Sequence, residues 1–422
     1  MGTSVAVLLI LAWVPADDAA PPAADAEGEA ASPIAPASAS WDIAIPEAVS
    51  PIARQSGWIF PYAAFNNQPR QIWLEAEYLI WYGKGVHLPP LVTGGPQGSA
   101  AVPGEPGVFV AIGETTLTHP HRSGGRFLGG IWLDYDQALG VEAGYLFAGE
   151  RTVHRTAGAA VRPESPVLAR PFFDVQRGEL SSSLVLFPDF RTHLVDVAYS
   201  SWFQGTEVSA IINHSFGLRH RWDWLVGFRF LEFQEELRAQ EQGKIDRVAP
   251  RLGGSRLYVE DELETRNRLL GAHASVRCEA CWGPWEVEVL GRVSLGGVEQ
   301  KLGVEGLTIV DPAADLPEAY YGGFLALPSN SGVHSRWRFA AVPELTARVG
   351  YSFWHRCTLY VSYTLVYWPG VLRAADQVDL RINPSQLPLA PVPQGGPEFP
   401  RRLFDESTYW IQALGLGLEL RF

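Results

Sequence analysis

Two cysteines with the spacing of a redox motif are the first residues that could do chemistry in this chain. Cys278-Glu-Ala-Cys281 places two thiols three positions apart, but thioredoxin-like chemistry needs this motif within a βαβ unit. Here the motif lies at the end of a strand-like segment, directly before a turn. We therefore expect a disulfide between Cys278 and Cys281, or two free thiols. Cys357 lies at the neighbouring turn, so one of the three cysteines must stay unpaired within the chain.

The histidines offer little for metal binding. His119-Pro-His121 is the one close pair among ten histidines, and the proline between them disturbs any regular ligand geometry. We predict no metal and no cofactor, and solvated histidines in a loop.

A hydrolytic site is the enzymatic alternative. Acidic groups beside a histidine can activate water for attack on a peptide, as in omptin-like proteases, which are ten-stranded barrels. The nearest collection is Glu150, Arg151, His154 and Asp196, and it contains no paired acidic motif beside a histidine. We therefore do not expect an enzyme.

The elements that carry these residues follow from the hydrophobic pattern. At the C-terminus, Leu414, Leu416, Leu418, Leu420 and Phe422 alternate with small and charged residues. A period of two residues indicates a β-strand, and such an apolar face opposite a polar one suits a membrane barrel. Ten segments have this character: Gln71–Tyr82, Gly125–Leu133, Leu139–Thr152, Ser201–His214, Trp222–Leu237, Thr265–Cys281, Pro284–Lys301, Trp337–Phe353, Cys357–Arg373 and Tyr409–Phe422.

Long and short connections alternate strictly between these segments. Short periplasmic turns, long extracellular loops and an even strand count are typical of outer-membrane barrels. The pattern predicts an all-β, antiparallel up-and-down barrel of ten strands, in which Tyr409–Phe422 pairs with Gln71–Tyr82. Twelve strands stay open, because Phe187–Val197 could add strand within the second long loop. Tryptophans near both ends of the strands, such as Trp73, Trp81 and Trp368, are expected to form interfacial girdles.

Charged residues recur on the face opposite the apolar one and are predicted to line the lumen. They either line a narrow aqueous path or pair across the lumen and fill it. Because ten strands leave an interior only slightly wider than a filled eight-stranded barrel, we favour a largely occupied lumen. The candidates are Glu142, Asp223, Arg229, His273, Arg277, Glu286, Glu288, Arg292, Glu344, Arg348, Glu419 and Arg421.

The N-terminus and the composition set the organisation of the chain. Val5–Val14 is apolar and precedes Pro15-Ala16, which predicts a signal peptide over residues 1–16. Residues 17–70 are rich in Ala, Pro and acidic residues and read as a disordered leader, and 71–422 as the barrel. A net charge of −13 excludes a nucleic-acid partner.

A family resemblance supports this interpretation. Trp73-Leu-Glu-Ala-Glu-Tyr-Leu-Ile-Trp81, Leu225–Leu231, Tyr363–Trp368 and the ending Tyr409–Phe422 resemble the beta-barrel porin-7 family of outer-membrane barrels from planctomycetes. The resemblance implies the fold and an outer-membrane location, and it brings no substrate or catalytic residues. The partners expected are membrane lipid and the barrel-assembly machinery, through the C-terminal strand; the oligomeric state stays open.

Three functions therefore remain for the structure to weigh. The first is a surface protein whose long loops have a structural or binding role, with limited solute passage. The second is a general small-solute porin, and the third is an omptin-like surface protease. A soluble β-sandwich that binds polysaccharide through exposed tryptophans is the alternative from another fold class.

Overall fold

The structure is a computed structural model, and it describes residues 71–118, 121–160, 166–186, 190–216, 220–245, 254–312, 316–354, 356–390 and 395–422. The predicted signal peptide and leader lie outside the described residues, as do His119 and Pro120. No helix within the described part of the chain is long and apolar enough to cross a membrane.

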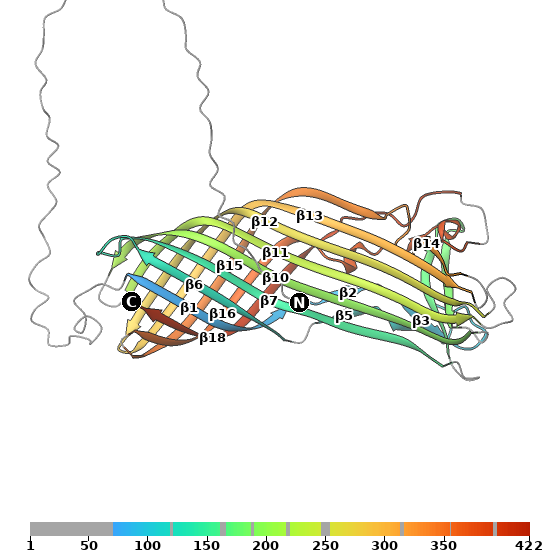
Figure 1. Cartoon of the computed structure of the whole chain (residues 1–422), viewed down its shortest axis with the longest axis horizontal. Helices are drawn as coiled ribbons and strands as arrows, with labels where there is room; N and C mark the ends of the chain where they lie inside the picture. The colour runs from blue at the N-terminus through green and yellow to red at the C-terminus, as the bar shows by residue number, and fades with distance from the viewer. Residues whose placement is uncertain are drawn as a thin grey trace, which may run out of the picture. The chain divides into compact units, whose positions relative to one another are not determined.

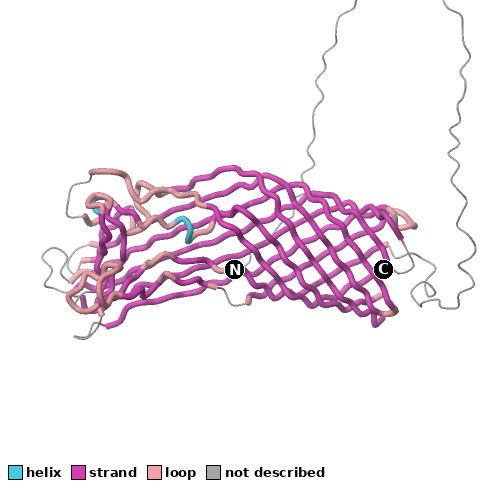
Figure 2. The backbone as a smooth tube through the Cα atoms, turned by 180° about the vertical axis from the view of Figure 1, so that it is seen from behind, coloured by secondary structure: helices cyan, strands magenta, loops and turns pink. Residues whose placement is uncertain are grey.

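Ten antiparallel strands form a closed barrel (Figures 1 and 2). Each strand pairs with its neighbours in the chain, and β1 and β18 close the ring, with Trp73 opposite Arg421 and Trp81 opposite Ala413. The predicted closing pair is therefore confirmed. The barrel strands are β1 (Ile72–Gly83), β6 (Arg122–Trp132), β7 (Leu139–Ala160), β10 (Phe190–Phe216), β11 (His220–Ile245), β12 (Arg256–Trp282), β13 (Trp285–Asp311), β15 (Gly332–Trp354), β16 (Cys357–Leu372) and β18 (Glu406–Arg421).

Six of these strands are much longer than a bilayer requires. β10, β12 and β13 each have 27 residues, whereas a tilted transmembrane strand needs only about 9–11. The segment around Phe190–Val197, which left twelve strands open, is the start of β10 and not an additional strand. Much of the predicted loop sequence is thus barrel wall that extends beyond the long-loop end.

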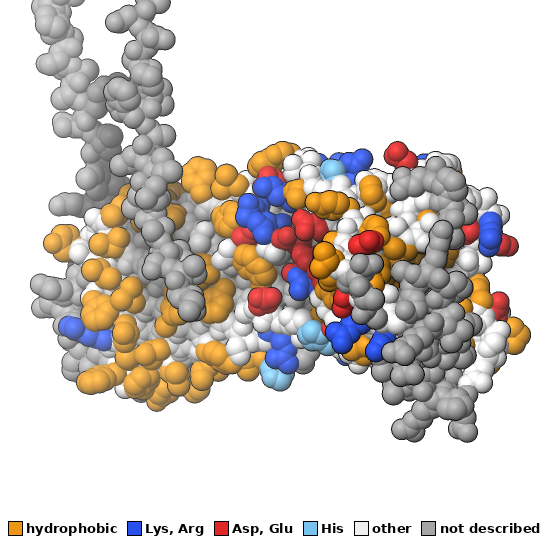
Figure 3. Space-filling model, turned by 45° about the vertical axis from the view of Figure 1, so that its right-hand side comes forward, with side chains coloured by type: hydrophobic (Ala, Val, Ile, Leu, Met, Phe, Trp, Pro, Cys, Tyr) orange, Lys and Arg blue, Asp and Glu red, His pale blue; other side chains and the backbone are white. Residues whose placement is uncertain are grey.

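The lower part of the wall, toward the short turns, is apolar outside and polar inside. On β11, Trp224, Val226 and Phe228 are 50%, 45% and 73% exposed, whereas Asp223 and Arg229 on either side of them are buried. Figure 3 shows hydrophobic side chains gathered over one end of the barrel, with a band of charged side chains beyond them. An apolar outer face around a polar interior is what a lipid bilayer stabilises.

The upper part of the wall reverses this polarity. Farther along the same strand, Glu236, Arg238 and Gln240 point outward, while Leu237 and Ala239 are buried inside. Water surrounds this part, so its polar face lies outside and its apolar face covers a core. The period of two residues continues without a break, but the apolar face changes sides.

That core is formed by loops that fold back into the barrel. We call residues 84–118, 166–186, 322–331 and 373–390 the loop plug. It contains a sheet of β3 (Val92–Gly95), β4 (Phe109–Ile112), β8 (Val167–Asp174), β9 (Glu179–Leu186) and β17 (Arg381–Ile382), and a pair of β2 (Val86–Leu88) and β5 (Thr115–Leu117). The short strand β14 (Glu318–Tyr321) extends the wall at β13. Loop residues such as Leu88 and Phe172 pack with wall residues such as Val197 in one hydrophobic cluster.

The tryptophans follow the girdle pattern only in part. Trp222, Trp282, Trp285, Trp337 and Trp354 are exposed on the outer face, as interfacial anchors would be. Correcting the prediction, three others point inward and are at most 7% exposed: Trp73, Trp81 and Trp368. They lie on the inward-facing positions of β1 and β16, so they fill the interior.

Candidate functional site

The lumen within the apolar belt is the candidate site, and two groups of ion pairs occupy it. The upper group centres on Arg229 and Arg292, which together contact Glu207 and Glu344. All four side chains are at most 9% exposed. Arg126 adds a pair with Glu77 at 3.4 Å. Three arginines and three glutamates therefore balance one another in this upper group.

The lower group lies nearer the short turns and contains more acids than bases. Arg277 contacts Glu142 at 2.6 Å and Glu288 at 3.6 Å. Arg348 lies within 3.6 Å of four carboxylates: Glu75, Glu286, Glu288 and Glu419. Arg421 contacts three: Glu279, Glu286 and Glu419.

Side chains leave little free space between the two groups. The cavity there has a volume of about 40 Å³ and is bordered by Glu75, Glu77, Arg126, Arg292 and Arg348. A cavity needs roughly 10–15 Å³ of such space to hold one water, so only a few waters fit. The charged side chains of the two groups thus fill much of the interior at this level.

The structure places every predicted lumen residue in the interior or at its rim. Ten of the twelve belong to the two ion-pair groups just described. His273 lies 3.0 Å from the hydroxyl of Ser209, and Asp223 receives hydrogen bonds from Arg221 and Asn213 at the short-turn end. Sequence reasoning missed Glu75, Glu77, Arg126, Glu207 and Glu279, although the period of two residues within the predicted strands would have found them.

Of the two states expected for Cys278 and Cys281, a disulfide or free thiols, the structure has the free thiols. Cys357 also has a free thiol. Cys278 and Cys281 both lie in β12, where successive side chains alternate between faces, so a separation of three places them on opposite sides of the wall. Cys281 shares the inward face with Glu279, and Cys278 is on the outward one.

Of the four residues considered for a hydrolytic site, the structure brings His154 and Asp196 into contact. Nδ1 of His154 lies 3.0 Å from Oδ2 of Asp196, across β7 and β10. Their side chains are 59% and 26% exposed, on the water-facing outside of the wall. The pair therefore does not face the barrel's mouth, where a peptide substrate would be held between loops.

The loop plug closes the barrel above the lumen, and buried polar contacts anchor it to the wall. Arg373 binds Glu235 at 2.7 Å and donates to the hydroxyl of Tyr199 at 3.0 Å. Burial and the carboxylate of Glu235 raise the pKa of Tyr199 well above its usual value. Asn267 on β12 donates to and accepts from the backbone of Leu372, the last residue of β16, directly before the plug segment that begins at Arg373. The plug is thus fixed to several wall strands.

A groove lies at the upper rim, on the outward side of β10 to β13. Its volume is about 650 Å³. It combines apolar side chains, including Leu194, Tyr258 and Ile309, with the charged Lys244, Arg256 and Asp311. This groove is large enough to hold a small ligand.

An apolar belt around a polar, ion-paired lumen and a C-terminal strand that closes the ring define a membrane β-barrel. The family model described as "Putative beta barrel porin-7 (BBP7)" matches residues 73–422. The chain belongs to this family, as the sequence predicted, and it is a porin-like barrel of the outer membrane. The short turns then face the periplasm and the long loops the exterior.

Solved structures with a similar arrangement are distant. The outer membrane protease OmpT from Escherichia coli is 7% identical, with 84% of this chain and 97% of that chain covered and a TM-score of 0.41. The P. putida toluene transporter TodX is 8% identical, with 84% and 91% covered and a TM-score of 0.20. A Pseudomonas aeruginosa FadL homologue is 8% identical, with 85% and 91% covered and a TM-score of 0.22. The search of curated protein sequences finds no match.

Proposed function

We propose that this barrel does not conduct solutes and that it serves at the cell surface as a structural or binding protein. The observation that carries the proposal is the double closure of the lumen. Ion pairs leave about 40 Å³ within the membrane-spanning part, and the loop plug fills the wider part above it with a hydrophobic cluster. A general porin needs a continuous water-filled channel, which this arrangement opposes.

The ion pairs within the membrane-spanning lumen are costly to separate, which favours a permanently closed lumen. Arg229 and Glu344 are almost fully removed from solvent, with side chains 0% and 2% exposed. Separating such a buried pair leaves two unpaired charges and costs several kcal/mol. Thermal fluctuation therefore opens this path rarely, and any passage would be restricted to water.

Planar-bilayer recording of the refolded full-length protein tests the proposal. We expect no discrete conductance steps at either polarity, whereas a general porin inserted in the same bilayer gives them. Insertion is verified on the same preparation by heat-modifiable migration on a gel, so that silence is not mistaken for failed reconstitution. Regular, salt-dependent steps from the inserted protein would overturn the closed barrel in favour of the porin alternative.

The rim groove is the part of the surface that supports a binding role. Its apolar floor and the charges of Lys244, Arg256 and Asp311 would suit an amphipathic ligand. A screen of cell-surface components against the refolded barrel, with Tyr258→Ala as the groove variant and Trp354→Ala at the opposite end as the matched control, tests this role. Binding that is unaffected by Tyr258→Ala would remove the groove from the proposal.

The protease alternative receives a specific test at the His154–Asp196 pair. A His–carboxylate contact of 3.0 Å can orient an imidazole as a base, but here both side chains lie on the outer surface of the wall. We expect no cleavage of basic fluorogenic peptides by the refolded barrel. Cleavage that His154→Ala abolishes would establish the enzyme instead.

A further inference from the structure

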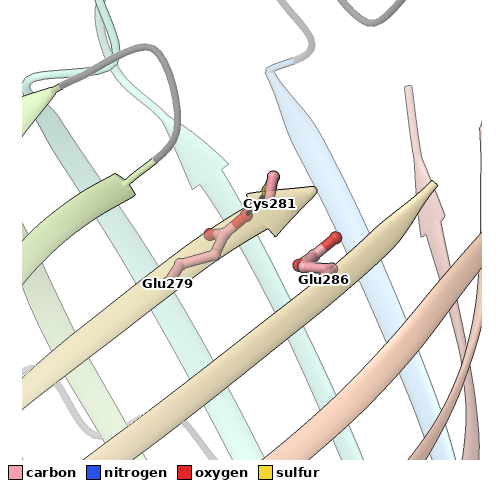
Figure 4. Close-up of side chains that lie close together, drawn as sticks. All are labelled: Glu279, Cys281 and Glu286. Atoms are coloured by element: carbon pink, nitrogen blue, oxygen red, sulfur yellow. Dashed lines mark hydrogen bonds between the residues drawn. The ribbon is translucent and has the colours of Figure 1, made fainter. Parts of the chain in front are cut away.

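Three potential metal ligands share the inward face of the hairpin between β12 and β13. Cys281 lies directly opposite Glu286 in the strand register, and Glu279 precedes Cys281 by two residues on the same face. One ligand atom from each of the three lies within 4.8 Å of the others. Figure 4 shows the three side chains close together beside the turn. A two-residue turn fixes the hairpin, so the cluster is held by rigid elements.

One of these ligands has an unsatisfied atom. Glu286 is 4% exposed, and its Oε1 accepts a hydrogen bond of 2.7 Å from Arg421. Its Oε2 has no hydrogen-bond partner among the described residues, although it is buried. Buried carboxylate oxygens are normally paired with a donor or a cation. Arg421 thus fixes one oxygen of Glu286 and leaves the other available.

The net charge of the surrounding ion-pair group also favours a bound cation. Six glutamates join the lower lumen group, but the arginines in it are only three: Arg277, Arg348 and Arg421. The upper group is balanced, with three residues of each sign. A surplus of carboxylates in a poorly solvated space attracts cations. The surplus is at the periplasmic end, where the cysteine lies.

We propose that Glu279, Cys281 and Glu286 bind a thiophilic divalent cation of the zinc class. Zn²⁺ accepts thiolate and carboxylate ligands at about 2.0–2.3 Å, so a small inward movement of the three side chains completes the contacts. The Cys281 S–H bond breaks, its proton passes to bulk water, and a metal–sulfur bond forms. Three protein ligands leave the fourth position to water. Hard cations such as Ca²⁺ prefer all-oxygen sites and do not compete.

The site is reachable from the periplasm. Glu279 and Cys281 are partly exposed, and they lie four and two residues before the turn residue Gly283. Arg421 reduces the net attraction, because its guanidinium lies within 4.0 Å of both glutamates. The affinity is therefore set by competition between this arginine and the metal for the same carboxylates.

Cadmium titration of the reduced, refolded full-length barrel in detergent tests the site. Cd²⁺ replaces Zn²⁺ at thiolate sites and adds an ultraviolet charge-transfer band from each bound sulfur. We expect a band for one thiolate per chain, which Zn²⁺ displaces and Ca²⁺ does not. Cys281→Ser should abolish the band, and Glu286→Gln should weaken Cd²⁺ binding at least about tenfold.

Cys278→Ser and Cys357→Ser are matched controls, since both remove a thiol at the same end of the barrel but not from this cluster. Both should retain the full band. All variants must show heat-modifiable migration, so that loss of binding is not loss of fold. The proposal is overturned if the wild type gives no band, if Cys281→Ser keeps it, or if Cys278→Ser loses it.

Discussion

Asp261 on the barrel wall and Arg170 on the loop strand β8 form a fully buried ion pair, with 2.9 Å between Oδ2 and Nη1. The other oxygen of Asp261 accepts hydrogen bonds from the backbone N–H groups of Phe324, Leu325 and Ala326. The guanidinium of Arg170 lies over the ring of Phe324, 4.4 Å from its centroid. One wall carboxylate therefore fixes two separate segments of the loop plug.

Asp261→Ala should release the plug while the membrane-spanning part stays folded. The change removes the nearer of the two carboxylates that pair with Arg170, leaves only Glu241 at 3.9 Å, and frees three N–H groups, which costs about 3–5 kcal/mol. Protease treatment of the refolded barrel should then cut within residues 166–186 or 322–331. Glu262→Ala, one residue along but outward-facing, is the control and should leave the digestion pattern unchanged. An unaltered pattern for Asp261→Ala would show that other contacts hold the plug.

Because the polarity reverses along β11, an arginine introduced on its outer face should cost stability within the apolar belt but not above it. Phe228→Arg places a charge on the apolar belt and should cost about 2–4 kcal/mol. Gln240→Arg, also outward-facing but above the belt, should change the free energy of unfolding by less than about 0.5 kcal/mol. Urea-dependent folding into lipid vesicles measures both. Equal costs at the two positions would place the membrane boundary elsewhere.

The sequence predicts the ten strands and their closure because the period of two residues is strong inside the apolar belt. It underestimates the strand lengths, since Leu237 and Ala239 alternate with Glu236 and Arg238 just as strand residues do, but with the apolar side inward. The upper wall has water outside and the loop plug inside, so its apolar residues face inward, as they do in a sheet of a soluble protein. The reversal within one strand could not be located without knowing that the loops fold back inside.

The sequence predicts which residues point into the lumen, but it does not predict which of them form ion pairs with one another. Alternation assigns Arg229 and Glu344 to the interior, but they lie on β11 and β15, and their contact depends on the tilt and curvature of the closed ring. The same holds for Asp261, whose loop partners come from segments without a regular pattern. For Cys278 and Cys281, by contrast, alternation alone argues against the disulfide.

Glu236, Glu262 and Glu264 lie close together on the outer face of the upper wall, and removing one of these charges should stabilise the barrel at neutral pH. Burial raises the pKa of Glu236, and so do Glu262 and Glu264, although Arg238 opposes the shift; Glu236 and Glu264 are also directly opposite in the register. A raised folded-state pKa contributes stability below the unfolded value of about 4.3, and this contribution is lost as the pH rises through the folded-state pKa.

Glu236→Gln should therefore raise the free energy of unfolding at pH 7 by roughly 0.2–1 kcal/mol, and the difference from wild type should disappear at acid pH. Unfolding titrations at both pH values measure this. Gln240→Glu on the same face serves as the converse, because it adds a carboxylate opposite Glu260. A gain that persists unchanged at low pH would rule out the electrostatic explanation.

The number of thiols that react with a maleimide tests whether the cysteines are free. Because Cys278 and Cys281 lie on opposite faces of β12, three thiols per chain should react with a maleimide after denaturation without reductant. Before denaturation, Cys281 should react from the aqueous side, whereas lipid should shield Cys278. One reactive thiol in the denatured chain would restore the disulfide and contradict the described strand geometry.

Arg229 is one of the two arginines that contact both central glutamates of the upper lumen group. It contacts Glu344, and Glu207 at 3.4 Å, so Arg229→Met leaves buried carboxylates with one arginine fewer and should cost about 3–5 kcal/mol. Pairing it with Glu344→Leu removes both charges of the closest pair. Such apolar replacements are often neutral or stabilising, so the double variant should recover most of the loss in vesicle-folding titrations. If the double variant is no more stable than Arg229→Met, the residues do not act as a pair.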